Sequence, residues 1–190
     1  PICIEKSKNK PNNIIKNNRE EVWHCFNNQF NLPLDIYWLQ IVSLELNKTT
    51  ETFIMTSIII EMINEYLNPE LYNAIEAGYG YKLNFNPYHN SIVIKVKGYS
   101  QKINLILKEI LNVLFNFSNN FEELKFNMIK NKFKRDTSNI PLLAPYQLLN
   151  YNLEKEWIIN FRGYQNLIET VDSITFDDTF YEDISLRTIQ

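Results

Sequence analysis

Two runs of alternating apolar and polar residues, 81–86 and 92–97, stand on either side of the sequence Pro-Tyr-His-Asn. Because successive side chains of a strand point to opposite faces, each run predicts one apolar face and one mostly polar face. The Pro and Asn residues between the runs favour a turn. The pattern therefore predicts an antiparallel hairpin on which the flanking helices pack.

A third strand is predicted over residues 34–46, which read L-D-I-Y-W-L-Q-I-V-S-L-E-L. Its aromatic and β-branched residues are typical of strands. Both of its faces are largely apolar in the first half, which is the pattern of a strand covered on both sides. We therefore expect this strand to lie in the centre of a sheet.

Apolar residues three and four positions apart recur along the rest of the chain, and this spacing indicates helices. The predicted helices cover residues 51–67, 101–117, about 121–135, 146–159, 164–171 and 175–187. Residues suited to capping precede several of them: Thr49 or Thr50, Asn68 with Pro69 opening a further short helix, Ser100, and Asn120 with Glu123 as a capping box.

The predicted helix over about 121–135 carries a cluster of lysines, which we expect on its solvated face. The residues predicted to face inward are Phe121, Leu124, Met128 and Ile129.

The order of these elements predicts an α+β fold, with a mixed, mainly antiparallel sheet and helices packed on one face. Residues 1–20 are polar and rich in Lys and Asn, so we interpret them as an N-terminal arm or inter-domain linker. Residues 21–190 are predicted to form one domain.

Composition narrows the classes of function. The formal net charge is −3, which gives no electrostatic case for binding nucleic acid or an anionic membrane. No stretch approaches the roughly 20 apolar residues of a membrane span. Two cysteines form no disulfide framework, so a reducing compartment is the default and we expect the protein to be cytoplasmic, although a single bridge is not excluded.

A metal site is not indicated. The chain has two histidines, His24 and His89, and neither has a second histidine four positions away. His24 and Cys25 are adjacent, so in a strand they would face opposite ways. A site built from these residues with Cys3 would need long-range folding, and we interpret the histidines as structural or loop residues.

Paired carboxylates are the other chemical candidate. Glu61 and Glu65 lie four positions apart on one predicted helix and share a face, where such pairs can bind metal or act as acid and base. Without a histidine partner, a solvated role is favoured. The sequence also has no phosphate-binding loop and no nucleophile elbow. We therefore predict no catalytic, cofactor-binding or metal-ligating residue in this chain.

The order of three segments resembles a known family. The segments are V-W-H-C-F-N-N-Q-F-N-L-P, then A-G-Y-G-Y-K-L, then I-V-I-K-V-K-G-Y-S. They resemble the third, non-catalytic domain of insulin-degrading enzyme and nardilysin, which are pitrilysin-type peptidases with an inverted zinc motif. The resemblance covers residues 21–180, and V-K-G-Y is its most specific part. Trp23 stands where the family has its Trp, but His24 and Cys25 replace the usual residues after it.

The resemblance implies that catalysis belongs to a different domain of the family's proteins. Family members contain four homologous α+β domains in two halves that close around a chamber, and the first domain carries the zinc motif His-x-x-Glu-His and a distal Glu. No residue here matches that motif, so this chain is predicted inactive alone, and zinc is expected in the catalytic domain of a full-length enzyme.

The resemblance also implies partners. The third domain helps to wall the chamber and contacts peptide substrate, so the expected partners are a peptide and the catalytic half of the same or another peptidase chain; a homo-oligomer is left open. A complete domain would add a strand and a helix after about residue 190, so we expect the chain to be C-terminally incomplete.

Two alternatives remain at the level of the sequence. The chain could be a freestanding, non-enzymatic binding or interaction protein derived from that domain. It could also be a structural subunit, like the processing-peptidase relatives that serve as cores of respiratory complexes. A His-x-x-Glu-His motif in upstream coding sequence would favour the peptidase, and a mitochondrial presequence would favour the structural subunit.

Overall fold

The structure is a computed structural model that describes residues 10–25, 32–116, 123–158 and 161–175. The chain divides after Leu34 into two compact units, which are described separately below. The predicted helix over 175–187, the inward position of Phe121 and the capping box at Asn120 lie outside the described residues.

The first unit contains an antiparallel hairpin of β1 (Asn12–Lys16) and β2 (Glu21–His24). Its turn is closed by Asn17, whose side-chain oxygen accepts hydrogen bonds from the backbone N–H groups of Arg19 and Glu20, both at 2.8 Å. Asn is favoured in turns for this reason. The boundary that the sequence predicts at residue 20 therefore falls inside a hairpin, because the two strands pair across it.

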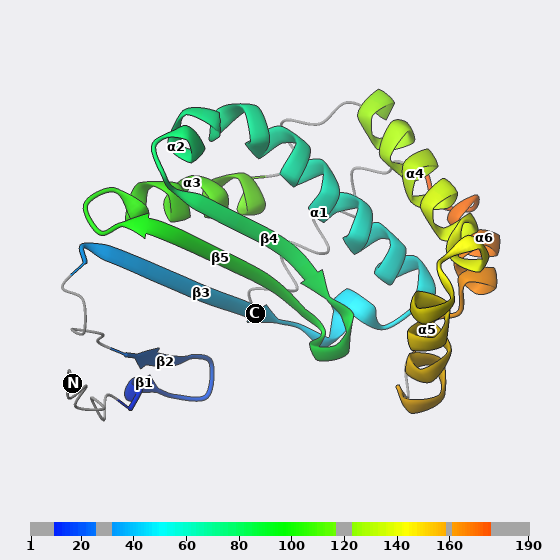
Figure 1. Ribbon diagram of the computed structural model, residues 1–190, viewed down its shortest axis with the longest axis horizontal. Coiled ribbons are helices and arrows are strands. Elements are labelled where there is room, and N and C mark those ends of the chain that lie inside the picture. Colours follow the sequence, from blue (N-terminus) through cyan, green and yellow to red (C-terminus); the bar gives the residue numbers. More distant parts are fainter. Residues whose placement is uncertain (1–9, 26–31, 117–122, 159–160, 176–190) are drawn as a thin grey trace, which may run out of the picture. The chain divides into compact units, whose positions relative to one another are not determined.

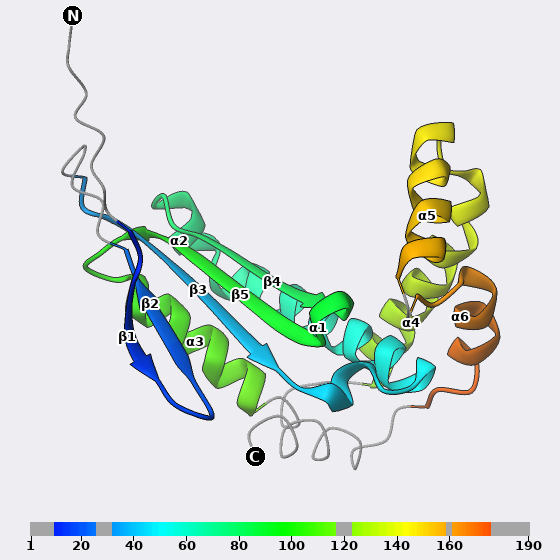
Figure 2. The same cartoon turned by 90° about the horizontal axis from the view of Figure 1, so that it is seen from below.

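The second unit contains a three-stranded sheet of β3 (Leu34–Val42), β4 (Gly80–Asn86) and β5 (Ser91–Tyr99), in the order β3-β5-β4. The predicted hairpin is β4 and β5, paired antiparallel (Figure 1). β3 runs antiparallel to β5, with its arrowhead at the opposite end (Figure 1). The prediction that this strand lies centrally is wrong for the described residues: β5 is central and β3 is an edge (Figure 2).

Glycine in the V-K-G-Y motif has a structural role. Gly98 has a φ of +154°, and a Cβ atom there would collide with the ring of Tyr79. The ring of Tyr79 packs edge-on against that of Tyr99, with centroids 5.9 Å apart. The glycine therefore lets the segment before β4 lie against the end of β5, and the motif that carries the resemblance serves the fold.

The helices confirm the α+β class, and those that contact the sheet cover its inner face (Figure 1). They are α1 (Thr50–Glu70), α2 (Tyr72–Glu76), α3 (Ile103–Phe115), α4 (Glu123–Ser138), α5 (Pro145–Trp157) and α6 (Tyr164–Val171), with short 3-10 turns η1 (Leu44–Asn47), η2 (Pro87–His89) and η4 (Ile140–Leu142). Among the described residues, no helix combines the length and apolar character that crossing a membrane requires.

α1 begins with a capping box, in which the Thr49 and Thr52 side chains each accept a hydrogen bond from the other's backbone N–H. It then continues through Pro69, so the prediction that Asn68 caps a new helix is wrong. The buried side chains of Leu67 and Leu71 flank the proline and hold the helix on the core. The side-chain oxygen of Asn68 instead accepts a hydrogen bond from the Tyr81 hydroxyl at 2.8 Å.

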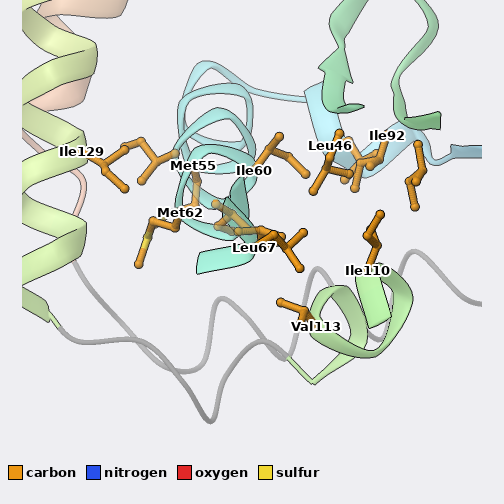
Figure 3. Close-up of a cluster of buried hydrophobic side chains, with 14 of the residues drawn as sticks. Leu46, Met55, Ile60, Met62, Leu67, Ile92, Ile110, Val113 and Ile129 are labelled. Atoms are coloured by element: carbon orange, nitrogen blue, oxygen red, sulfur yellow. The ribbon is translucent and has the colours of Figure 1, made fainter. Parts of the chain in front are cut away.

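The core lies between α1, the inner face of the sheet and the other helices. Figure 3 shows Ile129 of α4 on one side of α1, and Ile110 and Val113 of α3 beyond its other side. The sheet contributes alternate residues of the hairpin, which are Tyr81, Leu83, Phe85, Ile92, Ile94 and Val96. Because α1 is covered on several sides, it is apolar around most of its circumference.

Two further predictions differ from the structure. Ser100 does not cap α3, since the N-cap residue is Lys102 and makes no side-chain capping bond. On α4, Leu124 and Met128 are 75% and 72% exposed, whereas Phe126 and Ile129 are buried. Two apolar stripes run along this helix, and helical spacing alone does not decide which one faces the core. α1 and α6 cover the stripe that includes Phe126.

The two stripes of α4 give a direct test. Phe126→Ala should lower the free energy of unfolding by about 3–5 kcal/mol, because the fully buried ring leaves a cavity. Met128→Ala on the same helix should change it by less than about 0.5 kcal/mol. Urea unfolding followed by circular dichroism measures both. Equal losses in the two variants would show that α4 is oriented differently.

Candidate functional site

The histidine and cysteine residues do not meet. His24 lies in β2 of the first unit and His89 in η2 of the second. Cys25 is exposed, and Cys3 lies outside the described residues. Across the described part of the chain, no group of three His, Cys, Asp or Glu residues could hold a metal ion. Our assignment of no catalytic, cofactor-binding or metal-ligating residue stays a prediction.

The carboxylate pair on α1 is divided between two roles. Glu61 accepts a hydrogen bond from the Lys132 ammonium of α4, with Nζ and Oε1 2.5 Å apart, and this raises the pKa of Lys132 above its ordinary value. Glu65, one turn further, lines a groove of about 700 Å³ between α1 and α4 together with Met128 and Arg135. Glu61 is thus part of an inter-helix salt bridge rather than half of an acid–base pair.

A larger surface with chemical character is the outer face of the sheet, opposite the helices. On β3, the side chains of Ile36, Trp38 and Val42 point outward and are 64%, 68% and 61% exposed. The alternate residues of β3, such as Leu39 and Ile41, pack on the core. β3 therefore presents apolar side chains on both faces, and helices cover one of them.

Three lysines accompany the apolar strip. Lys82 of β4 and Lys95 of β5 are cross-strand partners, so their side chains share the outer face. The side chain of Lys95 extends toward β3, where its Nζ lies 5.3 Å from the centroid of the Trp38 ring. Lys97 lies over Gly80, where a Cβ atom would meet the lysine side chain. None of the three forms an ion pair with a carboxylate of the described residues.

The backbone of β3 is open on one side in the described structure. The N–H of Ser43 donates to the carbonyl oxygen of Asn90 at 2.9 Å, so Ser43 points toward the β5 side. Backbone groups alternate in direction along a strand. The N–H and C=O groups of the even-numbered residues 36–42 therefore point to the free edge. Natural edges are blunted by Lys or Pro, and this nine-residue strand contains neither.

An arginine fixes the segment between β3 and α1. The Arg162 guanidinium donates to the Asn47 carbonyl oxygen at 2.8 Å, to its side-chain oxygen at 3.0 Å, and to the Thr50 hydroxyl at 3.2 Å. It also lies 5.8 Å from the ring centroid of Phe53. The planar guanidinium fork therefore satisfies the hydrogen-bond acceptors of this buried turn, and these bonds fix where β3 ends and α1 begins.

Burial and a nearby carboxylate act on the pKa of Arg162 in opposite directions. Burial lowers the pKa of Arg162, and the nearby charge of Glu51 opposes that shift. The pKa of Glu51 is lowered mainly by the hydrogen bond from the Thr49 side chain, with its own backbone N–H and Arg162 contributing. Because the folded pKa of Glu51 is depressed, its contribution to stability is present at neutral pH and is lost as the pH falls through that value.

Sequence reasoning missed this arginine. Residues 161–163, Phe-Arg-Gly, fall between the helices predicted over 146–159 and 164–171, and Arg162 lies more than a hundred positions from its partners. The weak signal was a single arginine between an aromatic residue and a glycine. The sequence pattern did predict the apolar character of β3. It did not predict that the register of β4 and β5 places lysines beside this strand.

The fold defines the class of protein. A crystal structure of pitrilysin superposes on 95% of the chain with a TM-score of 0.79 at 15% sequence identity, and the matched part is 19% of that structure's chain. The fold is therefore that of a pitrilysin-like peptidase domain. Residues 3–166 match the family described as the middle or third domain of peptidase M16, and the chain belongs to that family.

Similar sequences have consistent names. Insulin-degrading enzyme of Drosophila melanogaster is 28% identical over 165 residues, which is 82% of this chain and 15% of that protein. Human insulin-degrading enzyme is 30% identical over 99 residues, or 52% of this chain. Nardilysin of Rattus norvegicus is 25% identical over 138 residues, or 73% of this chain. The chain spans less than a fifth of the length of each relative.

The Arg162 fork predicts a localised loss of stability. Arg162→Met should lower the free energy of unfolding by about 2–3 kcal/mol, because the buried oxygens of Asn47 lose their charged donor. Arg162→Lys should restore less than half, since an ammonium cannot reproduce the fork. Arg135→Met is the control: its guanidinium is exposed and, among the described residues, forms an ion pair only with the neighbouring Asp136, so the loss should stay below about 0.5 kcal/mol. Urea unfolding would contradict this view if both methionine variants lost the same amount.

Proposed function

We propose that this chain is the non-catalytic middle domain of an insulin-degrading-enzyme-like or nardilysin-like zinc metalloendopeptidase, where it walls the substrate chamber and helps to bind peptide. Membership of the M16 middle-domain family supports the proposal. The relatives named insulin-degrading enzyme and nardilysin extend far beyond the matched segment, so further domains are proposed as its partners.

Zinc chemistry is assigned to another domain. M16 peptidases are zinc enzymes, but the residues that the structure describes do not suit the metal: the two histidines lie in separate units, and Glu61 is paired with Lys132. A zinc site needs three convergent protein ligands with one open position. The proposed contribution of this domain is therefore binding and positioning of the peptide rather than bond cleavage.

The open edge of β3 is the observation that carries the peptide-binding part. An extended peptide can add a strand to such an edge, where main-chain hydrogen bonds supply affinity and alternate side chains meet the neighbouring strand. On the outer face, those side chains would lie beside Ile36, Trp38 and Val42. Burial of these exposed side chains would add to the main-chain bonds.

A pair of variants at one position tests this mode of binding. Ile36→Pro removes an N–H that points to the free edge, whereas Ile36→Thr keeps the N–H and shortens the side chain. Binding of fluorescently labelled insulin B chain, chosen because of the relatives' name, is measured by anisotropy. The proline variant should bind about tenfold more weakly, since a main-chain bond is lost, and the threonine variant about two- to threefold more weakly.

The controls separate this proposal from its alternatives. Both variants should unfold at the same urea concentration as the parent within error, because neither change touches the core. Equal affinities for all three proteins would exclude strand addition at β3. Zinc-dependent cleavage of the B chain by the purified chain would contradict a non-catalytic role. A gene product that lacks a His-x-x-Glu-His domain would favour the freestanding binding protein instead.

A further inference from the structure

The outer face of the sheet is unusual in its charge. The chain as a whole carries a net charge of −3, yet the outward positions of β3, β4 and β5 hold three lysines and no Asp or Glu. These outward residues include Ile36, Trp38, Gln40, Val42, Lys82, Asn84, Asn86, Ser91, Val93, Lys95 and Lys97. The face that the helices leave open therefore carries basic side chains and no acidic ones.

Two of these lysines do not help the strands to pair. Like charges directly opposite each other on two strands are destabilising, and Lys82 and Lys95 are such a pair. No carboxylate of the described residues neutralises either one. Lys95 instead turns away from Lys82 and rests over Trp38, on the strand with the free edge. The arrangement places an ammonium group beside the very edge where a peptide would pair.

We propose that this face selects acidic peptides, with Lys95 contacting a carboxylate of the bound strand and Lys82 and Lys97 reinforcing the field. The inference rests on the proposed function in one respect, that an extended peptide pairs with β3. It adds what the peptide must carry: a Glu or Asp that faces outward close to Trp38.

The geometry of a sheet sets where that acid lies. A strand added to β3 would run about 4.8 Å from it, and the outward side chains of the peptide would stand beside Ile36, Trp38 and Val42. The Lys95 ammonium over the Trp38 ring lies within reach of a carboxylate opposite that ring. Residues two positions before and after the acid would meet Ile36 and Gln40, and a residue four positions away would meet Val42, so apolar side chains fit opposite Ile36 and Val42.

The test uses three labelled peptides about ten residues long that differ only in one central residue, which is Glu, Gln or Lys, with Val two positions away on one side and four positions away on the other. Their dissociation constants for the full chain are measured by fluorescence anisotropy in about 50 mM and about 300 mM sodium chloride. The Glu peptide should bind about tenfold more tightly than the Gln peptide at low salt, and the Lys peptide most weakly. The preference should shrink to about threefold or less at high salt, because the lysines are partly exposed.

Matched variants identify the lysines responsible. Lys95→Gln should reduce the preference for the Glu peptide to about threefold, and the double variant with Lys82→Gln should abolish it, while the affinity for the Gln peptide stays unchanged. Lys108→Gln on α3 is the control, since it removes an equal charge elsewhere on the surface. The urea midpoint of the double variant should not fall, since a like-charge pair is removed.

Each outcome decides the proposal. Equal binding of the Glu and Gln peptides overturns charge selection and leaves peptide binding at β3 intact. If neither these peptides nor the insulin B chain binds, the proposed function itself fails along with the selection. Tighter binding of a single-stranded oligothymidylate of about ten nucleotides than of the Glu peptide, at the same salt, would overturn the proposal in favour of a nucleic-acid surface.

Discussion

The packing of α1 against the inner face of the β4–β5 hairpin is the constraint on which the rest of the second unit depends. Fully buried residues of this contact include Ile58 and Ile63 on the helix and Leu83 and Ile94 on the strands. Burial of one such side chain is worth about 1.5–3 kcal/mol, so this contact dominates the stability of the unit. α3, α4 and α6 then pack around α1, which explains why that helix is apolar around most of its circumference.

Because the helices cover one face of the sheet, the residues on the other face do not contribute to the core. These residues can then be chosen for contact with a partner, and sites grafted onto a shared fold commonly carry function in this way. On this scaffold, the open face offers a strand edge, an apolar strip and a set of lysines.

Local pattern predicted local structure well. The alternation in residues 81–97 determines the hairpin because each strand must bury one face, and the capping residues at Thr49 fix where α1 begins. Features that depend on distant partners were not predictable. Pro69 stays inside α1 because Leu67 and Leu71 anchor it, Phe126 faces the core because α1 and α6 cover its stripe, and Arg162 finds Asn47 across more than a hundred residues.

The position of β3 shows how a mismatch between pattern and structure carries functional information. Apolar residues on both faces predict a strand with neighbours on both sides, whereas the described residues supply a neighbour on one side. Local pattern and observed fold usually agree, and disagreements concentrate at functional sites. The apolar outer side chains of β3 and its unprotected backbone edge would both be satisfied by one additional strand, which is the role that we propose for a bound peptide.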